Sequence, residues 1–511
     1  MNPLRLCLTS LFFASIAFGQ HDAERNATQA IALGDLEKAE QLLAKSQPDY
    51  VAEVEFVRMM IDLKAGETAA AAAHARTALE RGLSFDRFLA GPRELLEPFH
   101  GTDEFKAIAA EHEGSALLHG PMLGSVTGSS ASFWVRTAGA STVKINTSGG
   151  VSEAVKTSAV SDYTAVLQVN GLEPGTEYTY EVEIDGEIVP AESDSFSTFP
   201  EQGQPAKFKV AFGGGAGFVP KWEYMWDTIG KFEPDALLML GDNVYIDQPQ
   251  HTLCQYYCYY RRQARPEWRK LTGTTSVYAI YDDHDFGTND CVPGPEIDTP
   301  VWKREVWNIF RQNWVNPAYG GGEEQPGCWQ DFQIGDVHFI LVDGRFYRDR
   351  KGKTMLGPVQ KAWLKETLKN SKGTFKVIAS PVPWTEGIKP GSKDPWDGYP
   401  EEREEIFSFI EESQIEGVFL IAADRHRTDL RTTKRENGYD LYEFESSRLT
   451  NRHTHGVIKT PGLIWGYKDT CSFALMKFDT TAETPEVTFE CITIDGEILH
   501  TYTLGLDKLK Y

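Results

Sequence analysis

LLMLGDNVYID, residues 237–247, joins an apolar run to two carboxylates and a phenol. The apolar residues are enough for one buried strand, and Gly241 marks its end. A metal site at the carboxyl end of a buried strand has this pattern, because the strand fixes the ligands and the loop lets them converge. An Asp after a Gly at a strand end is also typical of an ordinary turn. The metal prediction therefore depends on whether other strands end in similar chemistry.

The chain after Pro205 alternates apolar runs with helical patterns. This alternation predicts a layered α/β domain over residues 205–511, with functional residues at the strand ends. The expected strands are 207–212, 236–240, 277–281, 337–342, 375–380 and 417–423, and the clearest helices are 358–368 and 401–412.

Two further regions are expected upstream. Residues 20–115 are rich in Ala, Leu and Glu, and Gly34 and Gly66 each precede small residues at helical spacing. That pattern is typical of tetratricopeptide-type helical hairpins, whose period is about 34 residues. Two such units predict a region that caps another domain or binds a protein partner, and the small residues indicate helix packing. Residues 116–200 carry short alternating runs separated by turn signals, which predicts an all-β sandwich.

The N-terminus predicts export. Arg5 precedes an apolar run that ends in Ala17-Phe18-Gly19, which is typical of a secretory signal cleaved after Gly19. The run is shorter than the roughly 20 residues of a membrane span, and no other segment is expected to cross a membrane. We therefore expect residues 1–19 to be a signal peptide and the protein to be periplasmic or extracellular. The formal charge of −23 argues against nucleic acid as a partner.

The cysteines permit disulfides in an exported chain. Six remain once Cys7 is removed with the signal, so three bridges are possible. Cys254 and Cys258 allow a metal pair as an alternative, and Cys471 and Cys491 lie in strand-like stretches that suit a cross-strand bridge.

Metal-ligand chemistry follows four of the expected strands. Carboxylates, a phenol and imidazoles without thiols suit hard or borderline cations. Two cations bridged by one carboxylate would activate a water and stabilise an in-line phosphoryl displacement. Asp242 would be the bridge, His284 the acid for the leaving oxygen and Arg345 the clamp on the phosphate oxygens. The four clusters are Asp242 with Tyr245, Asp282 to Asp285, Asp343 to Arg348, and Asp424 with His426.

These clusters carry a family resemblance. From about Gly120 to the C-terminus, the chain resembles alkaline phosphatases of the D type, within the calcineurin-like metallophosphoesterases. The resemblance implies a fibronectin-III-like β domain ahead of a catalytic β-sandwich flanked by helices. Its motifs, in chain order, are Gly241-Asp242-x-x-Tyr245, Asp282-Asp283-His284-Asp285, Asp343-x-Arg345-x-Tyr347-Arg348, Asp394-x-Trp396-Asp397-Gly398-Tyr399 and Asp424-x-His426.

The resemblance also implies a ligand set. One metal would be held by Asp242, Tyr245 and His426, and a second by Asp242, Asp283 and Asp424. The family's metals are typically iron with calcium, and its substrates are phosphate mono- and diesters.

The chain departs from the family at Gly215, which occupies the position of a family Cys. The first metal would thereby lose a thiolate, which leaves the metal identity open. The glycine-rich run around it either offers backbone amides to a phosphate or forms a close-packed turn.

We therefore expect an exported phosphoesterase in which metal-bound hydroxide attacks phosphorus and His284 protonates the departing alkoxide. Its small-molecule substrate would contact Arg345, Asn243, His453 and His455, although the two histidines either line the site or cap a strand end. Two alternatives remain: a catalytically weakened binding protein, motivated by Gly215, and a hydrolase of a related anion ester such as a sulfate.

Overall fold

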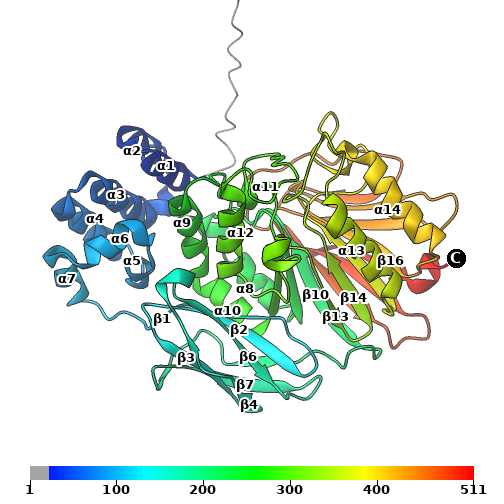
Figure 1. Ribbon diagram of the computed structural model, residues 1–511, viewed down its shortest axis with the longest axis horizontal. Helices are drawn as coiled ribbons and strands as arrows, with labels where there is room; N and C mark the ends of the chain where they lie inside the picture. The colour runs from blue at the N-terminus through cyan, green and yellow to red at the C-terminus, as the bar shows by residue number, and fades with distance from the viewer. Residues whose placement is uncertain (1–21) are drawn as a thin grey trace, which may run out of the picture.

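The structure is a computed structural model that describes residues 22–511 (Figure 1). The predicted signal peptide, residues 1–19, lies outside the described residues. No helix among residues 22–511 has the length and apolar character that crossing a membrane requires.

A six-stranded sheet carries the stretch that opened the sequence analysis. Its strands run in the order β12-β11-β10-β20-β21-β22, with β10, β11 and β12 parallel and the others antiparallel. The expected strands 207–212, 236–240 and 277–281 are confirmed within one residue at each end. The bounds are β10 Lys207–Gly213, β11 Ala236–Leu240, β12 Ser276–Ile280, β20 Ser472–Asp479, β21 Glu486–Thr493 and β22 Ile498–Gly505.

A seven-stranded sheet forms the second layer, in the order β13-β14-β15-β16-β18-β17-β19. Strands β14, β15, β16 and β18 are parallel, so their carboxyl ends lie at one edge. The bounds are β13 Gln330–Ile334, β14 Val337–Leu341, β15 Phe375–Ser380, β16 Val418–Ala422, β17 Thr428–Thr433, β18 Leu441–Ser446 and β19 Leu463–Tyr467.

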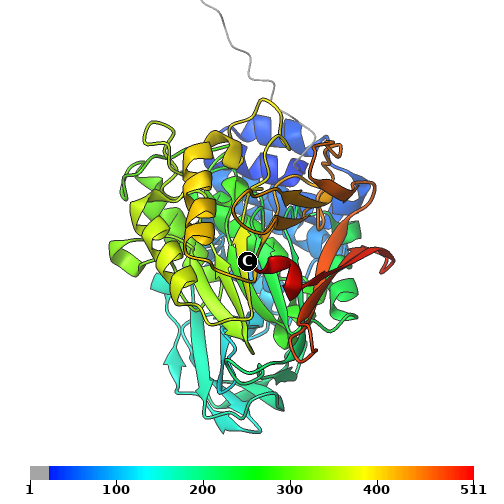
Figure 2. The same ribbon diagram turned by 90° about the vertical axis from the view of Figure 1, so that its right-hand side faces the viewer.

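The two sheets pack face to face through aromatic side chains. Phe339 of the seven-stranded sheet lies 6.4 Å from Phe208 and 5.7 Å from Phe478 of the six-stranded sheet, measured between ring centroids. Figures 1 and 2 show α13 and α14 on the side of this domain away from the N-terminal helices (blue). The helices of the domain include α8 Met225–Gly230, α9 Thr252–Gln263, α10 Pro266–Thr274, α12 Trp302–Asn313, α13 Gly357–Asn370 and α14 Pro400–Glu412.

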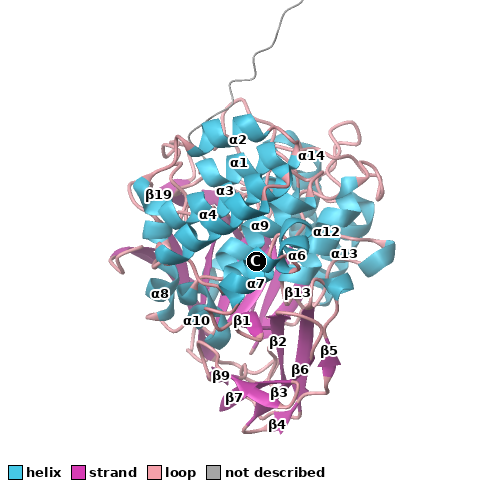
Figure 3. Cartoon of the chain, turned by 90° about the vertical axis from the view of Figure 1, so that its left-hand side faces the viewer, coloured by secondary structure: helices cyan, strands magenta, loops and turns pink. Residues whose placement is uncertain are grey.

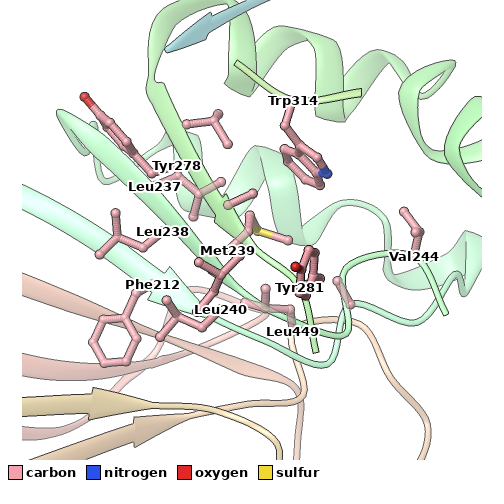
Figure 4. Packing of buried hydrophobic residues seen from close by; sticks show 14 of the residues in the cluster. Phe212, Leu237, Leu238, Met239, Leu240, Val244, Tyr278, Tyr281, Trp314 and Leu449 are labelled. Atoms are coloured by element: carbon pink, nitrogen blue, oxygen red, sulfur yellow. The ribbon is translucent and has the colours of Figure 1, made fainter. Parts of the chain in front are cut away.

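Strand β11 is buried on both faces. Its side chains alternate, with Leu237 and Met239 directed toward Trp314 and Leu238 and Leu240 toward Phe212 (Figure 4). All five residues of the strand are 0% exposed. A continuous apolar run is what a parallel strand covered on both faces requires, so burial fixes the point at which Gly241 and Asp242 emerge.

Two smaller sheets form the region between residues 117 and 197. One has the order β1-β2-β6 and the other β4-β3-β7-β8, and Phe133 of the first packs on Phe196, 5.3 Å away between ring centroids. The fibronectin-III likeness stays a prediction. The bounds are β1 Leu117–Gly124, β2 Ser130–Thr137, β3 Thr142–Thr147, β4 Gly150–Val151, β5 Val155–Lys156, β6 Thr164–Asn170, β7 Glu177–Ile184, β8 Glu187–Val189 and β9 Ser195–Ser197.

The N-terminal region is helical, and Figure 3 shows it above the β region. Helices α1 and α2 pack as one pair and α3 and α4 as another. Ala71, Ala75 and Ala78 of α4 are buried, as expected for small residues between helices, but the tetratricopeptide likeness stays a prediction. The bounds are α1 Ala23–Ala32, α2 Leu36–Leu43, α3 Val51–Ala65, α4 Thr68–Glu80, α5 Asp86–Ala90, α6 Arg93–His100 and α7 Asp103–Ala109.

One buried carboxylate joins the three regions. Asp162 of the β region accepts hydrogen bonds from Arg93 of the helical region (2.7 Å) and from Tyr260 of α9 (2.6 Å). Arg136 of β2 lies 2.9 Å from the same carboxylate. Because Arg93 and Tyr260 come from the other two regions, separating the regions would leave the buried Asp162 with only Arg136 of these three partners.

The disulfide expectation is wrong for this structure. All six cysteines among the described residues are free thiols. Cys491 on β21 faces Ala474 across the sheet, whereas Cys471 precedes β20 by one residue, so the register separates the expected pair.

Stability should depend on pH through Glu24. This side chain is fully buried, and burial together with the nearby Asp22 carboxylate raises its pKa to about 8. An acid whose pKa is higher in the folded state loses stability as the pH rises from its unfolded pKa through its folded one. Glu24→Gln should therefore melt several degrees above the wild type at pH 8 and close to it at pH 4. Glu37→Gln, on the exposed face of α2, is the control, and an equal difference at both pH values would contradict the assignment.

Candidate metal centre

Gly241 lets the ends of β11 and β12 meet. Its φ of +99° suits glycine, and a Cβ at this position would lie 2.5 Å from the Cβ of Asp282. Asp242 and Tyr245 follow with φ of 54° and 55°, in the left-handed region. Such backbone is sparsely populated by these residues and gathers at functional sites.

Three predicted ligands of the first metal converge. The Tyr245 hydroxyl donates to Asp242 Oδ2 at 2.9 Å and lies 2.8 Å from His426 Nε2. His426 Nε2 lies 3.5 Å from Asp242 Oδ2, and all three residues are at most 3% exposed. Asp242 Oδ1 and His426 Nδ1 have no hydrogen-bond partner, which is the state expected of buried ligand atoms that serve a cation.

Asp283 and His284 join the centre from α11, Asp283–Phe286, which follows β12. One ligand atom from each of Asp242, Asp283 and His284 lies within 4.8 Å of the others. The His284 ring stacks on Tyr245, with centroids 4.7 Å apart. The predicted cluster after β12 is therefore brought to the predicted cluster after β11.

The electrostatics of Asp242 favour a cation. Burial raises its pKa well above its usual range; His284 opposes this shift, and the carboxylates of Asp283, Asp282 and Asp285 add to it. Burial and the Asp242 carboxylate also raise the pKa of Tyr245. A bound cation would relieve the repulsion among these carboxylates. The donor set of carboxylate, phenol and imidazole fits the expected metals.

Asp424 follows β16 and has other partners. Its φ is 69°, and it is 9% exposed. Its Oδ2 lies 3.4 Å from Arg425 Nη1 and 3.9 Å from Lys389 Nζ. Among residues 22–511, Asp424 is not in the compact ligand group of Asp242 and Asp283, so its place as a ligand of the second metal stays a prediction.

Arg345 lies in a buried ion network. Its side chain is 0% exposed; Nε donates to Asp282, and Nη1 donates to Asp394 at 2.7 Å. Its Nη2 lies 3.6 Å from Asp283 Oδ1. The predicted contact with substrate stays a prediction; in this structure the guanidinium holds the carboxylates behind the centre.

Asn243 is tied to the end of β12. Its backbone N–H donates to Asp285 at 2.8 Å, and its Nδ2 donates to the Ile280 carbonyl at 2.8 Å. The buried Oδ1 has no hydrogen-bond partner. Its predicted role toward substrate stays a prediction.

His453 and His455 lie beside His426 rather than at a strand end. Their Nε2 atoms are 3.1 Å apart, and one ring nitrogen from each of the three histidines lies within 4.8 Å of the others. The hydroxyl of Thr454, between them, donates to the His426 carbonyl at 2.9 Å. Their predicted contact with substrate stays a prediction.

The glycine-rich run around Gly215 is a close-packed turn. The amide of Gly214 donates to Ser446 O (3.1 Å), and those of Gly215 and Ala216 donate to Gly241 O (3.3 Å) and Asp242 O (2.8 Å). These amides are therefore used within the fold and are not turned toward a phosphate.

Three residues near the centre escaped the sequence analysis. Asp247 Oδ1 lies 2.6 Å from His284 Nδ1, and Arg25 of α1 donates to Asp247 Oδ2 at 2.6 Å. Lys389, 19% exposed, lies 3.0 Å from Asp290 and 3.1 Å from Asp394. Asp247 is the last residue of the stretch that opened the sequence analysis and could have been considered from its position. No local sequence pattern indicates a role for Arg25 or Lys389.

The chain is similar in sequence to known phosphatases. Residues 210–461 match a family model described as PhoD-like phosphatase, and residues 114–203 match one described as a domain of unknown function. The chain is 22% identical over 314 residues to alkaline phosphatase D of Bacillus subtilis (strain 168), covering 51% of this chain and 52% of that protein. It is 23% identical over 234 residues to purple acid phosphatase 23 of Arabidopsis thaliana, covering 42% and 45%. The chain thus spans about half the length of these curated relatives.

Two solved structures share the fold. One is described as PhoD, with a TM-score of 0.61 at 16% identity over 75% of this chain and 88% of that one. The other is the purple acid phosphatase PPD1 from yellow lupin, with a TM-score of 0.58 at 13% identity over 76% and 75%. The layered α/β domain therefore shares its fold with these two proteins.

The turn at Gly215 should not accept a side chain. Its φ is +66°, and a Cβ would lie 2.9 Å from Arg448 N. Gly175 has a similar φ of +59° with nothing within 4 Å, so Gly175→Ala measures the backbone strain alone. Gly215→Ala should destabilise the protein by about 1–3 kcal/mol more than Gly175→Ala in chemical denaturation, because the close contact adds to the strain. Equal losses would show that the contact does not matter.

Proposed function

We propose that this chain, whose residues 210–461 match the PhoD-like phosphatase family, is a metal-dependent hydrolase of phosphate mono- or diesters. The observation that carries the proposal is the convergence of Asp242, Tyr245, Asp283 and His426 at the meeting ends of two sheets. The unpartnered Oδ1 of the buried Asp242 supports a cation there. From the sequence pattern of residues 1–19 we further infer that the enzyme is exported.

The metals would be held by Asp242, Tyr245, Asp283, Asp424 and His426. Bound cations would supply a nucleophilic water at neutral pH and neutralise charge on the phosphate. Carboxylate, phenol and imidazole donors suit iron and calcium, the metals of the resembling family.

His284 would protonate the leaving oxygen. Burial lowers its pKa, but the carboxylates of Asp247, Asp283 and Asp242 more than offset this and hold the pKa well above its usual range. Because Nδ1 is bonded to Asp247 at 2.6 Å, the proton for the leaving oxygen would come from Nε2.

Lys389 would contact phosphate oxygens. Its partly exposed ammonium lies 3.9 Å from Asp424. Burial lowers the pKa of the Lys389 amine, but the carboxylates of Asp424, Asp394 and Asp290 raise it by more. The net pKa lies above its ordinary value, so the amine stays charged. Arg345 would hold Asp283 in place. It would contact substrate only if it broke its ion pairs with Asp282 and Asp394.

His453 and His455 would supply nitrogen donors where the family thiolate is missing. Gly215 offers no side chain, and these imidazoles lie beside His426. Nitrogen donors bind transition metals better than calcium. The site would therefore hold a transition metal without the thiolate.

Asp242→Asn should abolish hydrolysis of an aryl phosphate by metal-loaded enzyme, because the shared carboxylate is lost. The activity should fall at least about 10³-fold, as for removal of other essential charge-stabilising groups. Asp235→Asn is a matched control at the opposite end of the same strand, where the carboxylate accepts from Lys209 N at 2.7 Å. Undiminished hydrolysis by Asp242→Asn would exclude the proposed centre.

The double variant His453→Ala/His455→Ala should bind less transition metal per chain while melting near the wild-type temperature. Metal content after dialysis, measured by elemental analysis, checks this. His500→Ala, on the remote β22, is the control. If the double variant retains the full metal content, the two imidazoles are not ligands.

A further inference from the structure

Two side chains of α1 in the N-terminal helical region, Arg25 and Gln29, reach the loop beside the proposed active site, and only Arg25 binds the Asp247 carboxylate. The Arg25 guanidinium on α1 is 3% exposed, and its Nη2 donates to Asp247 Oδ2 at 2.6 Å and to the Ile246 carbonyl at 3.1 Å. These partners lie 222 and 221 residues away along the chain. Arg25 also lies outside residues 114–203 and 210–461, which match known families.

The partner of Arg25 is the group that holds His284. Asp247 Oδ1 lies 2.6 Å from His284 Nδ1, while Asp247 Oδ2 accepts a hydrogen bond from Arg25. The amides of Ile246 and Asp247 both donate to the His284 carbonyl, at 2.7 and 3.0 Å. The backbone thus fixes the loop against His284, and Arg25 fixes the rotation of the carboxylate.

Arg25 itself has little freedom to move. Asp22 caps α1 by accepting from Arg25 N at 2.9 Å, and the same carboxylate accepts two hydrogen bonds from Arg261 at 2.7 and 2.9 Å. The other end of the guanidinium donates to Asn26 at 2.9 Å. Ala27 and Ile31 on the same helix are 0% exposed. The helix is therefore anchored on α9 by buried contacts on both sides of Arg25.

We propose that Arg25 is a positioning residue that the helical region contributes to the active site. It holds the Asp247 carboxylate in the orientation that directs His284, and so determines how well His284 delivers its proton. This inference rests on the proposed function. An ion pair that served only to dock the helical region would affect stability without affecting proton delivery.

Proton delivery has a chemical signature. A leaving group that is stable as an anion, such as 2,4-dinitrophenolate, departs without a proton, whereas phenol and simple alcohols depend on one. Loss of a positioned acid therefore slows esters in proportion to the basicity of their leaving group. Destabilisation of the fold, or loss of metal, slows all esters alike.

The experiment compares kcat for 2,4-dinitrophenyl phosphate, phenyl phosphate and an alkyl phosphate in metal-loaded, full-length enzyme. Arg25→Ala should lower kcat for phenyl and alkyl phosphate about 10- to 100-fold, which is part of the 10²- to 10⁴-fold contribution of general acids. It should leave kcat for the dinitrophenyl ester within about 3-fold, with KM little changed. Arg25→Lys should restore part of the loss, since an ammonium can still bind Asp247.

Arg87→Ala is the matched control. Arg87 belongs to the same helical region, is equally buried at 3% exposed, and donates to Glu53 at 2.8 Å, away from the centre. Its loss should lower the melting temperature but leave the ratio of the three rates unchanged. If Arg25→Ala does not fold, Arg25→Gln, which is shorter and uncharged but keeps a hydrogen-bond donor, takes its place.

The outcomes separate the two proposals. A uniform loss on all three esters in the Arg25 variants, or no loss on any, overturns the positioning role while the phosphatase assignment stands. Failure of the metal-loaded wild type to hydrolyse even the dinitrophenyl ester overturns the proposed function, and the positioning role with it.

Discussion

The close approach of Gly241 to Asp282 is the constraint on which the site depends. Because no side chain separates the ends of β11 and β12, the carboxylates of Asp242 and Asp283 enter one buried volume. Like charges there repel strongly, and desolvation adds to the penalty. The surrounding protein neutralises part of this negative charge with Arg345 and Lys389. The unpartnered oxygen of Asp242 is where the proposed cation would neutralise the rest.

Much of the two-sheet domain could be predicted from the sequence because local patterns determine it. Strand β11 was expected at its observed bounds, and α13 and α14 were expected to within a few residues. The meeting of Asp242, Tyr245 and His426 could be anticipated only from the family resemblance, because these residues follow β11 and β16, which lie in different sheets. Features that depend on strand register were harder to predict from the sequence, and the expected Cys471–Cys491 bridge was wrong for that reason.

The roles of long side chains were the least predictable. Arg345 lies in the expected motif, yet its guanidinium turns to Asp282 and Asp394 instead of an open cavity. Arg25 has no local pattern at all, since its partner is 222 residues away. A residue's type and spacing indicate which chemistry it can perform, whereas only the packed chain decides which partner it meets.

The docking of α1 onto residues far along the chain limits the order in which the chain can fold. During synthesis the helical region emerges first, yet Asp22 and Arg25 are satisfied by Arg261 and Asp247, which appear more than 200 residues later. Until then these charges must stay hydrated, because burying them unpaired is too costly. The N-terminal helices therefore reach their final packing only once the central strands exist. The helical region is made before residues 247 and 261 but reaches its final packing after them.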